Sequence, residues 1–226
     1  MKIHRFYAPH IELKHDFWLH DPGLLQQWRK VLRFKAGEQL VLFDGQQDRL
    51  YKLLELKDAE AHLVLITEYA RKLPAKNIYL FWALLKKDKN DWVVQKCTEL
   101  GVSHFVPILA DRSEKTGFNE QRATKIAIEA AEQCGRSDIP SVREPINLTT
   151  AFNEFATKLQ LLVCEQSSDN QKLEITDTVG VFIGPEGGWS EAEKTLFDAH
   201  NTQHLNLHDF TLRAETACVT AIGKLV

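Results

Sequence analysis

The feature that most constrains the fold is an alternation of apolar, strand-like runs with longer helical patterns after residue 74. Strands rich in Val, Ile, Leu and Phe that lead into helices are what a parallel sheet covered on both faces requires. We therefore predict an α/β domain over residues 74–226. Its strand-like runs are 77–85, 105–109, 159–164, 179–183 and 202–207, and its helical patterns are 88–100, 119–134 and 190–200.

The first third of the chain has a different rhythm. Short strand-like runs dominate it, separated by turn signals such as Asp44-Gly45. A helix is predicted over 21–32, because Asp21 suits a helix cap and Pro22 suits the first turn. Closely spaced strands of this kind indicate a small barrel, which gives a predicted first domain of 1–73 with a boundary near Pro74. The runs are 3–7, 38–43, 50–56 and 62–69.

Charge and cysteine content narrow the classes of protein. The net charge of -3 argues against a protein whose whole surface binds nucleic acid. The charge is unevenly distributed, because residues 1–73 carry 12 basic and 10 acidic side chains, whereas the rest of the chain carries 16 basic and 21 acidic ones. The front of the chain thus supplies more of any positive field. The four cysteines form no Cys-x-x-Cys pair, so we expect neither a zinc site nor disulfides, and a cytoplasmic location. No apolar run has the length of a membrane span, which is roughly 18 residues.

The most informative segment is glycine-rich and lies between a predicted strand and a predicted helix. Three glycines in five positions expose backbone amides to a ligand, and Ser190 with Glu193 forms a capping-box pattern at the helix start. In an open α/β sheet this strand end is where ligands bind. A tight connection without a ligand is the alternative. Neither nucleotide-binding motif is present, and Glu186 would repel phosphate. The segment is Ile183-Gly184-Pro185-Glu186-Gly187-Gly188-Trp189-Ser190.

Two further polar segments follow predicted elements. Arg213 and Glu215 come after the last strand-like run, which brings them to the edge of the sheet that carries the glycine loop. They are a candidate functional pair or a structural ion pair. Residues 129–136 end the long helix at 119–134, with Gly135 as its terminating signal. Their polar side chains are typical of a solvated helix face, and the scattered histidines have no metal-ligand spacing.

Taken together and in order, these segments resemble the RsmE-type 16S ribosomal RNA uridine N3-methyltransferases of the SPOUT superfamily. The resemblance covers nearly the whole chain. The matching stretches are His4-Arg5-Phe6, Val31-Leu32-Arg33 with Gly37, Phe43-Asp44-Gly45, residues 96–102, residues 129–133 with Arg136 and Pro140, residues 183–188, and Leu212-Arg213-Ala214-Glu215-Thr216-Ala217.

The resemblance implies a fold and a reaction. The fold would be a PUA-like RNA-binding β-barrel at 1–73 and a SPOUT α/β methyltransferase domain at 74–226 whose C-terminal segment forms a trefoil knot. The reaction would transfer a methyl group from S-adenosylmethionine to N3 of one uridine of 16S rRNA in the assembled small ribosomal subunit, leaving S-adenosylhomocysteine. A homodimer and no metal are expected. The implied cofactor-binding residues are Cys164, Glu165, Gly184, Pro185, Glu186, Gly187, Gly188, Leu207, His208, Leu212 and Thr216.

The resemblance also suggests roles for charged residues. Arg213 is expected to stabilise the uracil anion, because guanidinium donors bind an oxygen where negative charge develops. Arg136 is the reserve candidate, and either Glu215 or Glu186 accepts the proton or orients the loop. The expected RNA contacts are Arg5, Arg29, Lys30, Arg33 and Lys35.

One position departs from the family pattern, since His208 stands where glycine is usual. Two alternatives to the predicted activity remain. One is an RNA-binding or ribosome-assembly protein of the same fold with little or no turnover. The other is a methyltransferase of this superfamily that acts on another RNA.

Overall fold

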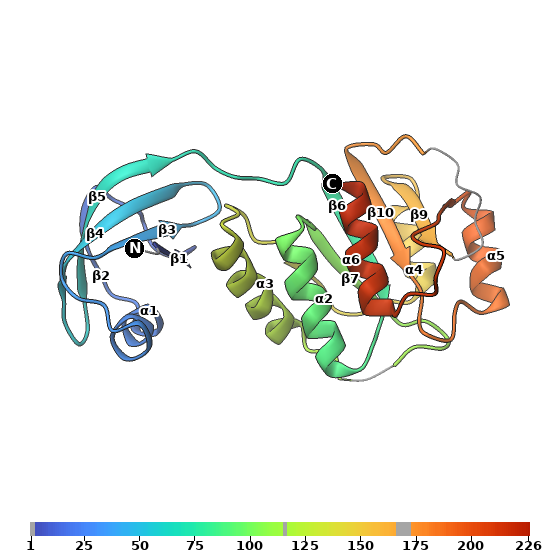
Figure 1. Cartoon of the computed structure of the whole chain (residues 1–226), viewed down its shortest axis with the longest axis horizontal. Helices are drawn as coiled ribbons and strands as arrows, with labels where there is room; N and C mark the ends of the chain where they lie inside the picture. The colour runs from blue at the N-terminus through green and yellow to red at the C-terminus, as the bar shows by residue number, and fades with distance from the viewer. Residues whose placement is uncertain (1–2, 115–116, 166–172) are drawn as a thin grey trace. The chain divides into compact units, whose positions relative to one another are not determined.

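The structure is a computed structural model that describes residues 3–114, 117–165 and 173–226. The chain divides into two units (Figure 1). One combines Met1–Leu73 with Ala131–Ile139, and the other combines Pro74–Ala130 with Pro140–Val226. Residues 131–139 lie in the predicted second domain, whereas the structure groups them with the first unit. They include the last turn of α3 (Glu120–Cys134), so one helix belongs to both units.

The N-terminal unit contains a five-stranded mixed sheet in the order β1-β3-β4-β5-β2. The pair β1 and β3 is parallel, and the other neighbours are antiparallel. The predicted strands are all present, whereas β2 has no counterpart in the prediction. Side chains such as Phe6, Leu40 and Tyr51 form the buried core of this unit. The strands are β1 (His4–Tyr7), β2 (Asp16–Leu19), β3 (Gln39–Phe43), β4 (Asp48–Leu56) and β5 (Ala61–Tyr69).

The predicted helix at 21–32 is two short helices in the structure. Asp21 caps α1 (Pro22–Gln26) by accepting a hydrogen bond from the Leu24 amide at 2.9 Å, as its position predicts. The chain then widens into a π-helix, η1 (Gln27–Leu32), which buries Trp28 in the core. It ends at Arg33, which adopts the left-handed conformation with φ of 55°.

The C-terminal unit is built on a six-stranded sheet in the order β11-β9-β10-β6-β7-β8, and every described pair is parallel. This confirms the predicted parallel α/β architecture. The short strand β8 and the helix α4 (Leu148–Phe155) were absent from the prediction. The strands are β6 (Asn77–Ala83), β7 (His104–Ile108), β8 (Ser141–Val142), β9 (Gln160–Cys164), β10 (Thr178–Ile183) and β11 (Gln203–Leu205).

Helices cover both faces of this sheet, as continuous apolar strands require. Leu80 and Val181 point to the face covered by α2 (Lys87–Glu99), α3 and α6 (Ala214–Leu225). Their neighbours Phe81 and Phe182 point to the opposite face, where α4 and α5 (Glu191–Ala199) pack. The carboxyl ends of β9, β10 and β11 therefore meet at one edge, where the connecting loops are exposed to a common space.

The predicted ends of the helices are present. Gly101 follows α2 with φ of 99°, and Gly135 follows α3 with φ of 86°, which is the conformation that ends helices and favours glycine. At the start of α5, Ser190 and Glu193 make both hydrogen bonds of a capping box. These local signals fix where the chain leaves the helices and enters the loops.

Candidate functional site

The glycine-rich loop joins β10 to α5. It turns through a hydrogen bond from the Gly188 amide to the Pro185 carbonyl at 2.8 Å, and Gly188 has a positive φ of 68°. A Cβ atom on Gly184 would lie 3.0–3.1 Å from the indole of Trp189. The loop therefore needs glycine at 184 for close approach and at 188 for backbone conformation. Its main chain is left accessible between the buried Ile183 and the helix start.

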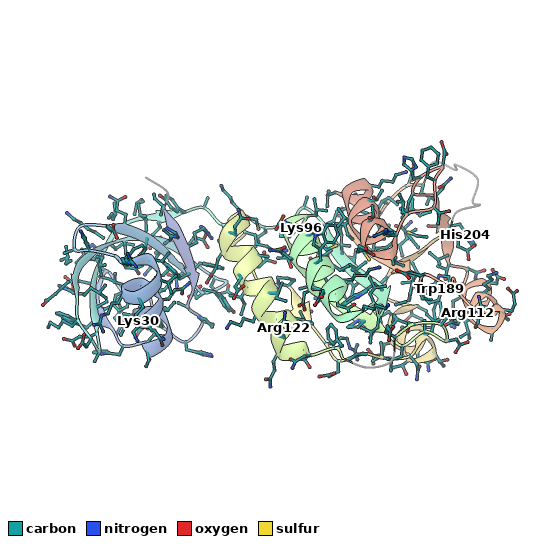
Figure 2. All side chains as sticks on the ribbon, turned by 60° about the horizontal axis from the view of Figure 1, so that its bottom comes forward. Lys30, Lys96, Arg112, Arg122, Trp189 and His204 are labelled. Atoms are coloured by element: carbon teal, nitrogen blue, oxygen red, sulfur yellow. The ribbon has the colours of Figure 1, made fainter. Side chains whose placement is uncertain are left out.

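Residues of the segment after β7 form hydrogen bonds with this loop and with the start of α5. Arg112 donates a hydrogen bond from Nη1 to the Gly187 carbonyl at 2.9 Å, and its aliphatic stem lies against the Gly187 backbone. Ser190 donates to the Asp111 carboxylate at 2.5 Å, and the Asp111 amide donates to Glu193 at 3.0 Å. Figure 2 shows Arg112 and Trp189 in the same region of the C-terminal unit. The loop is thus anchored by side chains from a distant part of the sequence.

A cavity of about 500 Å³ opens at this edge of the sheet. All of the predicted cofactor-binding residues except Thr216 line it, and Thr216 is exposed on α6. Several lining residues were not among the predicted cofactor-binding residues. Ile183 and Trp189 lie in the predicted glycine-rich segment, and others follow Leu207, but Arg112 and Lys194 come from parts of the chain that were not predicted to line the site. The additional lining residues are Arg112, Ile183, Trp189, Lys194, Asn206, Phe210, Thr211, Ala214 and Ala217.

Residues 206–212 form another wall of the cavity, and His208 is used to shape it. The His208 amide donates to the Asn206 side chain at 3.1 Å, and the Phe210 amide donates to His208 Nδ1 at 3.0 Å. Lys224 of α6 donates to the Asn206 carbonyl at 3.1 Å. Where the family pattern has glycine, this chain uses an imidazole as a local hydrogen-bond acceptor.

The third wall follows β9. Cys164 lines the cavity, and burial raises the pKa of its thiol well above the ordinary value, so the thiol stays protonated. Glu165 lies 3.4 Å from Nδ1 of His204. The cavity therefore offers one carboxylate near β9 and two cations, Arg112 and Lys194, near the glycine loop and α5.

The predicted pair Arg213 and Glu215 lies at the first turn of α6, next to the cavity. Arg213 is the cap residue of α6 and is exposed, while its neighbours Leu212 and Ala214 line the cavity. Glu215 forms an ion pair with Lys89 of α2, with the two charged atoms 3.2 Å apart. The same Lys89 ammonium contacts Glu186 of the glycine loop at 2.5 Å. The two glutamates are thus joined by one lysine.

This contact changes the acidity of the groups involved. The hydrogen bond from Lys89 lowers the pKa of Glu186 below its ordinary value, and the charges of Lys86 and Arg213 contribute in the same direction. In return, the bond to Glu186 raises the pKa of Lys89. The lowered pKa makes the Glu186 carboxylate a weaker base than an ordinary glutamate.

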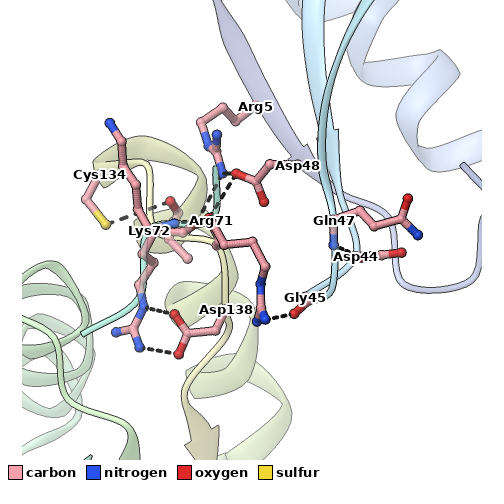
Figure 3. A network of polar contacts seen from close by, with 12 residues as sticks. Arg5, Asp44, Gly45, Gln47, Asp48, Arg71, Lys72, Cys134 and Asp138 are labelled. Carbon is pink, nitrogen blue, oxygen red and sulfur yellow. Dashed lines mark hydrogen bonds and ion pairs between the residues drawn. The ribbon is translucent and has the colours of Figure 1, made fainter. Parts of the chain in front are cut away.

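Two other predicted residues lie in the N-terminal unit. Arg136 is buried and forms an ion pair with Asp138 at 2.7 Å. Arg5 pairs with the buried Asp48 at 2.6 Å and also donates to the Arg136 carbonyl at 3.3 Å (Figure 3). Ser137 donates to the same Asp48 carboxylate at 2.9 Å. Both arginines are engaged in structural contacts, and their predicted roles in catalysis and RNA contact stay predictions.

The remaining predicted RNA contacts are exposed. Arg29 and Lys30 lie on η1, Arg33 ends it, and Lys35 follows. Arg29 pairs with the exposed Asp58. Across the described ranges, no group of His, Cys, Asp or Glu side chains is arranged to hold a metal ion. No helix in the same ranges is long and apolar enough to cross a membrane.

The class of protein is shown by a match to a family model. Residues 71–226 match the family model of the RNA methyltransferase domain, which agrees with a parallel α/β sheet carrying a loop-lined cavity at its edge. A crystal structure of a ribosomal RNA small subunit methyltransferase E from Neisseria gonorrhoeae, bound to S-adenosyl methionine, superposes with a TM-score of 0.89 at 27% identity and covers 99% of this chain and 96% of its own.

The particular family follows from full-length relatives. The ribosomal RNA small subunit methyltransferase E of Bacillus subtilis is 30% identical over 219 residues, which are 86% of this chain and 84% of the relative. A putative methyltransferase of Legionella pneumophila with bound SAM is 29% identical with a TM-score of 0.84, covering 100% of this chain and 97% of its own. The chain belongs to the ribosomal RNA small subunit methyltransferase E family.

Proposed function

We propose that this protein methylates N3 of one uridine of 16S rRNA in the small ribosomal subunit, with S-adenosylmethionine as the methyl donor. The observation that carries the proposal is the cavity where the loops after β9 and β10 meet the segment that leads into α6. The family membership supports the class of reaction, and two solved relatives carry this donor.

The residues present fit the donor. A volume of about 500 Å³ lies inside the range of small-molecule sites, which is roughly 300–1,000 Å³. Loop 184–188 offers main-chain donors and acceptors, while Leu207 and Leu212 offer apolar surface for a nucleoside. The indole Nε1 of Trp189 is buried beside Gly184 without a hydrogen-bond partner among the described residues. When bound, the donor supplies an electrophilic methyl group on a sulfonium centre.

The protein has two tasks in the transfer. It aligns the uracil N3 with the methyl carbon and excludes water, and such alignment contributes about 7–11 kcal/mol in intramolecular analogues. It also favours the uracil anion, because N3 carries a proton until activated. For a pKa about two to three units above neutral, ionisation costs roughly 3–4 kcal/mol. A cation beside the developing charge offsets this cost.

Arg213 is the cation that we assign to this task. It stands at the cap of α6, next to two residues of the cavity wall, and its guanidinium is exposed. The positive end of the helix adds to its field. Because the bond from Lys89 lowers the pKa of Glu186 and so makes it a weaker base, we do not assign it the proton; Glu215 remains the carboxylate candidate at this helix turn.

The experiment is methylation of small ribosomal subunits by the Arg213→Ala variant. We expect turnover to fall by at least 100-fold while the affinity for S-adenosylhomocysteine, measured by calorimetry, stays within about three-fold. Arg122→Ala, which removes an exposed arginine that pairs with Asp91 on α2, is the control. Full turnover by Arg213→Ala would remove Arg213 from the mechanism. A native protein that binds donor but modifies no RNA would favour the assembly-protein alternative.

The finer architecture is part of the proposal. We infer that the N-terminal sheet is a PUA-like RNA-binding barrel, that the C-terminal unit carries a trefoil knot, and that the protein acts as a homodimer. The exposed residues Arg29, Lys30, Arg33 and Lys35 then contact the phosphate backbone of the RNA. Analytical ultracentrifugation tests the dimer, and charge reversal at Lys30 tests the RNA contact by its salt-dependent binding.

A further inference from the structure

Lys89 is placed where three separate segments of the C-terminal unit meet. It lies in the first turns of α2, and its ammonium contacts Glu186 of the glycine loop at 2.5 Å and Glu215 of α6 at 3.2 Å. The Lys89 side chain is 29% exposed and that of Glu215 is 16% exposed. This shielding from water makes the contact with Glu215 stronger than an ordinary surface pair.

We propose that Lys89 is a positioning residue for methyl transfer, which fixes the glycine loop and the start of α6 relative to each other through Glu186 and Glu215. This inference rests on the proposed function. It concerns the spacing between the loop of the donor cavity and Arg213, which lies two residues before Glu215.

Lys89 is close to the donor cavity but does not line it. The residues that line the donor cavity include Glu186 and Ala214 but not Lys89. Lys89 lines an adjoining cavity of about 200 Å³, which shares Arg112, Pro185 and Glu186 with the first. The lysine therefore acts on the donor cavity through the two carboxylates, because it does not face that cavity itself.

Without this lysine, two carboxylates would face each other beside the cavity. Glu186 and Glu215 would repel, and Glu215 would be a partly buried charge without this counterion. The loop and the first turn of α6 would separate to bring both groups to water. Arg213 would move with that turn, so the catalytic cation and the methyl group would lose their alignment, and small misplacements of this kind lower rates steeply.

The test uses the full-length protein without ligand first. Hydrogen–deuterium exchange is measured for peptides covering 184–189 and 213–217 in the native protein and in Lys89→Met and Lys89→Arg. Lys125→Met is the matched control, because Lys125 is exposed on α3. We expect exchange in both peptides to rise at least 10-fold in Lys89→Met, to rise less than three-fold in Lys89→Arg, and to stay unchanged in Lys125→Met.

Single-turnover methylation of small subunits supplies the second readout. We expect the rate of the chemical step at saturating donor to fall 10-fold or more in Lys89→Met, with most of the rate kept by Lys89→Arg. A loss of donor affinity alone, with an unchanged chemical step, would overturn the positioning role. Unchanged exchange in both peptides of Lys89→Met would overturn the proposal outright.

Two further outcomes are separable. If Lys89→Met unfolds, Glu215→Gln replaces it, because this change removes the charge that pairs with the lysine and keeps the size of the side chain. Exchange of loop 184–189 should then rise. A loop that stays protected from exchange in Glu215→Gln would count against the proposal. If the native protein neither binds S-adenosylhomocysteine nor methylates RNA, the proposed function fails. The exchange data then still decide whether Lys89 joins the two segments.

Discussion

The Arg112 guanidinium donates a hydrogen bond to the Gly187 carbonyl at 2.9 Å, which joins the segment after β7 to the loop after β10. The contact places a cation at the wall of the candidate cavity and restrains a loop that contains three glycines. A loop of this composition loses much conformational entropy when it is ordered. The hydrogen bond from Arg112 therefore orders the loop in the absence of a ligand.

Replacing Arg112 should weaken donor binding. Arg112→Ala loses a hydrogen bond worth about 1 kcal/mol, which corresponds to roughly a five-fold weaker affinity for S-adenosylhomocysteine. Isothermal titration calorimetry measures the change. Arg143→Ala, which breaks the ion pair with Glu154 of α4, is the control and should bind like the native protein. Equal affinities for both variants would show that the loop is ordered without Arg112.

A methyl group at Gly180 should destabilise the sheet. Gly180 is in the middle of β10, and a Cβ there would lie 2.7 Å from the Phe81 ring and 2.9 Å from Leu161. Gly180→Ala should therefore lower the free energy of unfolding by about 1–3 kcal/mol through overpacking. Chemical denaturation measures this loss. Gly223→Ala is the matched control, since a Cβ on Gly223 of α6 would meet no atom within 4 Å; a loss of similar size there would contradict the packing argument.

The contact between Lys89 and Glu186 should respond to pH at both extremes. The pKa of Glu186 is lowered from 4.5, so its contribution to stability is complete above that value and is lost as the pH falls through the lowered pKa. The pKa of Lys89 is raised from 10.5, so its contribution is complete below that value and is lost as the pH rises through the raised pKa. In the Lys89→Met variant the pKa of Glu186 should move back toward 4.5, and NMR titration of the side-chain carboxyl groups measures this change. An unchanged titration would place the cause of the shift elsewhere.

In the N-terminal unit, the buried Asp48 should contribute more to the free energy of unfolding than an exposed acidic residue does. Its side chain is 2% exposed and accepts hydrogen bonds from Arg5 and Ser137. Asp48→Ala leaves the largely buried Arg5 guanidinium without this partner, a change that typically costs about 3–5 kcal/mol. Asp58→Ala removes the exposed partner of Arg29 and should cost less than about 1 kcal/mol. Thermal denaturation of the two variants compares them, and equal melting temperatures would refute the argument.

Local signals explain which parts of the fold could be predicted. The caps at Asp21 and Ser190 and the terminators Gly101 and Gly135 act through neighbours a few residues away, so their pattern is legible in the sequence. The parallel sheet followed from the continuous apolar strands. By contrast, β2 and β8 are only four and two residues long, and their pairing depends on distant strands. The π-helix at 27–32, which buries Trp28, was not predicted either.

For the candidate site, too, only the residues that are close together in the sequence could be predicted. The glycine loop could be predicted because its chemistry is contiguous, from the strand end to the helix cap. Arg112 and Lys89 were missed because they reach the site from other elements. A usable signal existed for Arg112, since it follows the strand-like run 105–109 at the carboxyl edge of the sheet. For Lys89 there was none, because only the packed structure brings α2 against the loop and α6.

The division of α3 between the two units has a practical consequence for fragments of this protein. A polypeptide that stops at Leu73 would omit Glu132, which accepts a hydrogen bond from the Tyr7 amide at 2.8 Å, and Ser137, which donates to Asp48. Such a truncation would expose unpaired polar groups in the very region that it was designed to isolate. The excised module would need residues 131–139 added back, through a linker or as a separate peptide, before its stability or any binding of RNA could be measured.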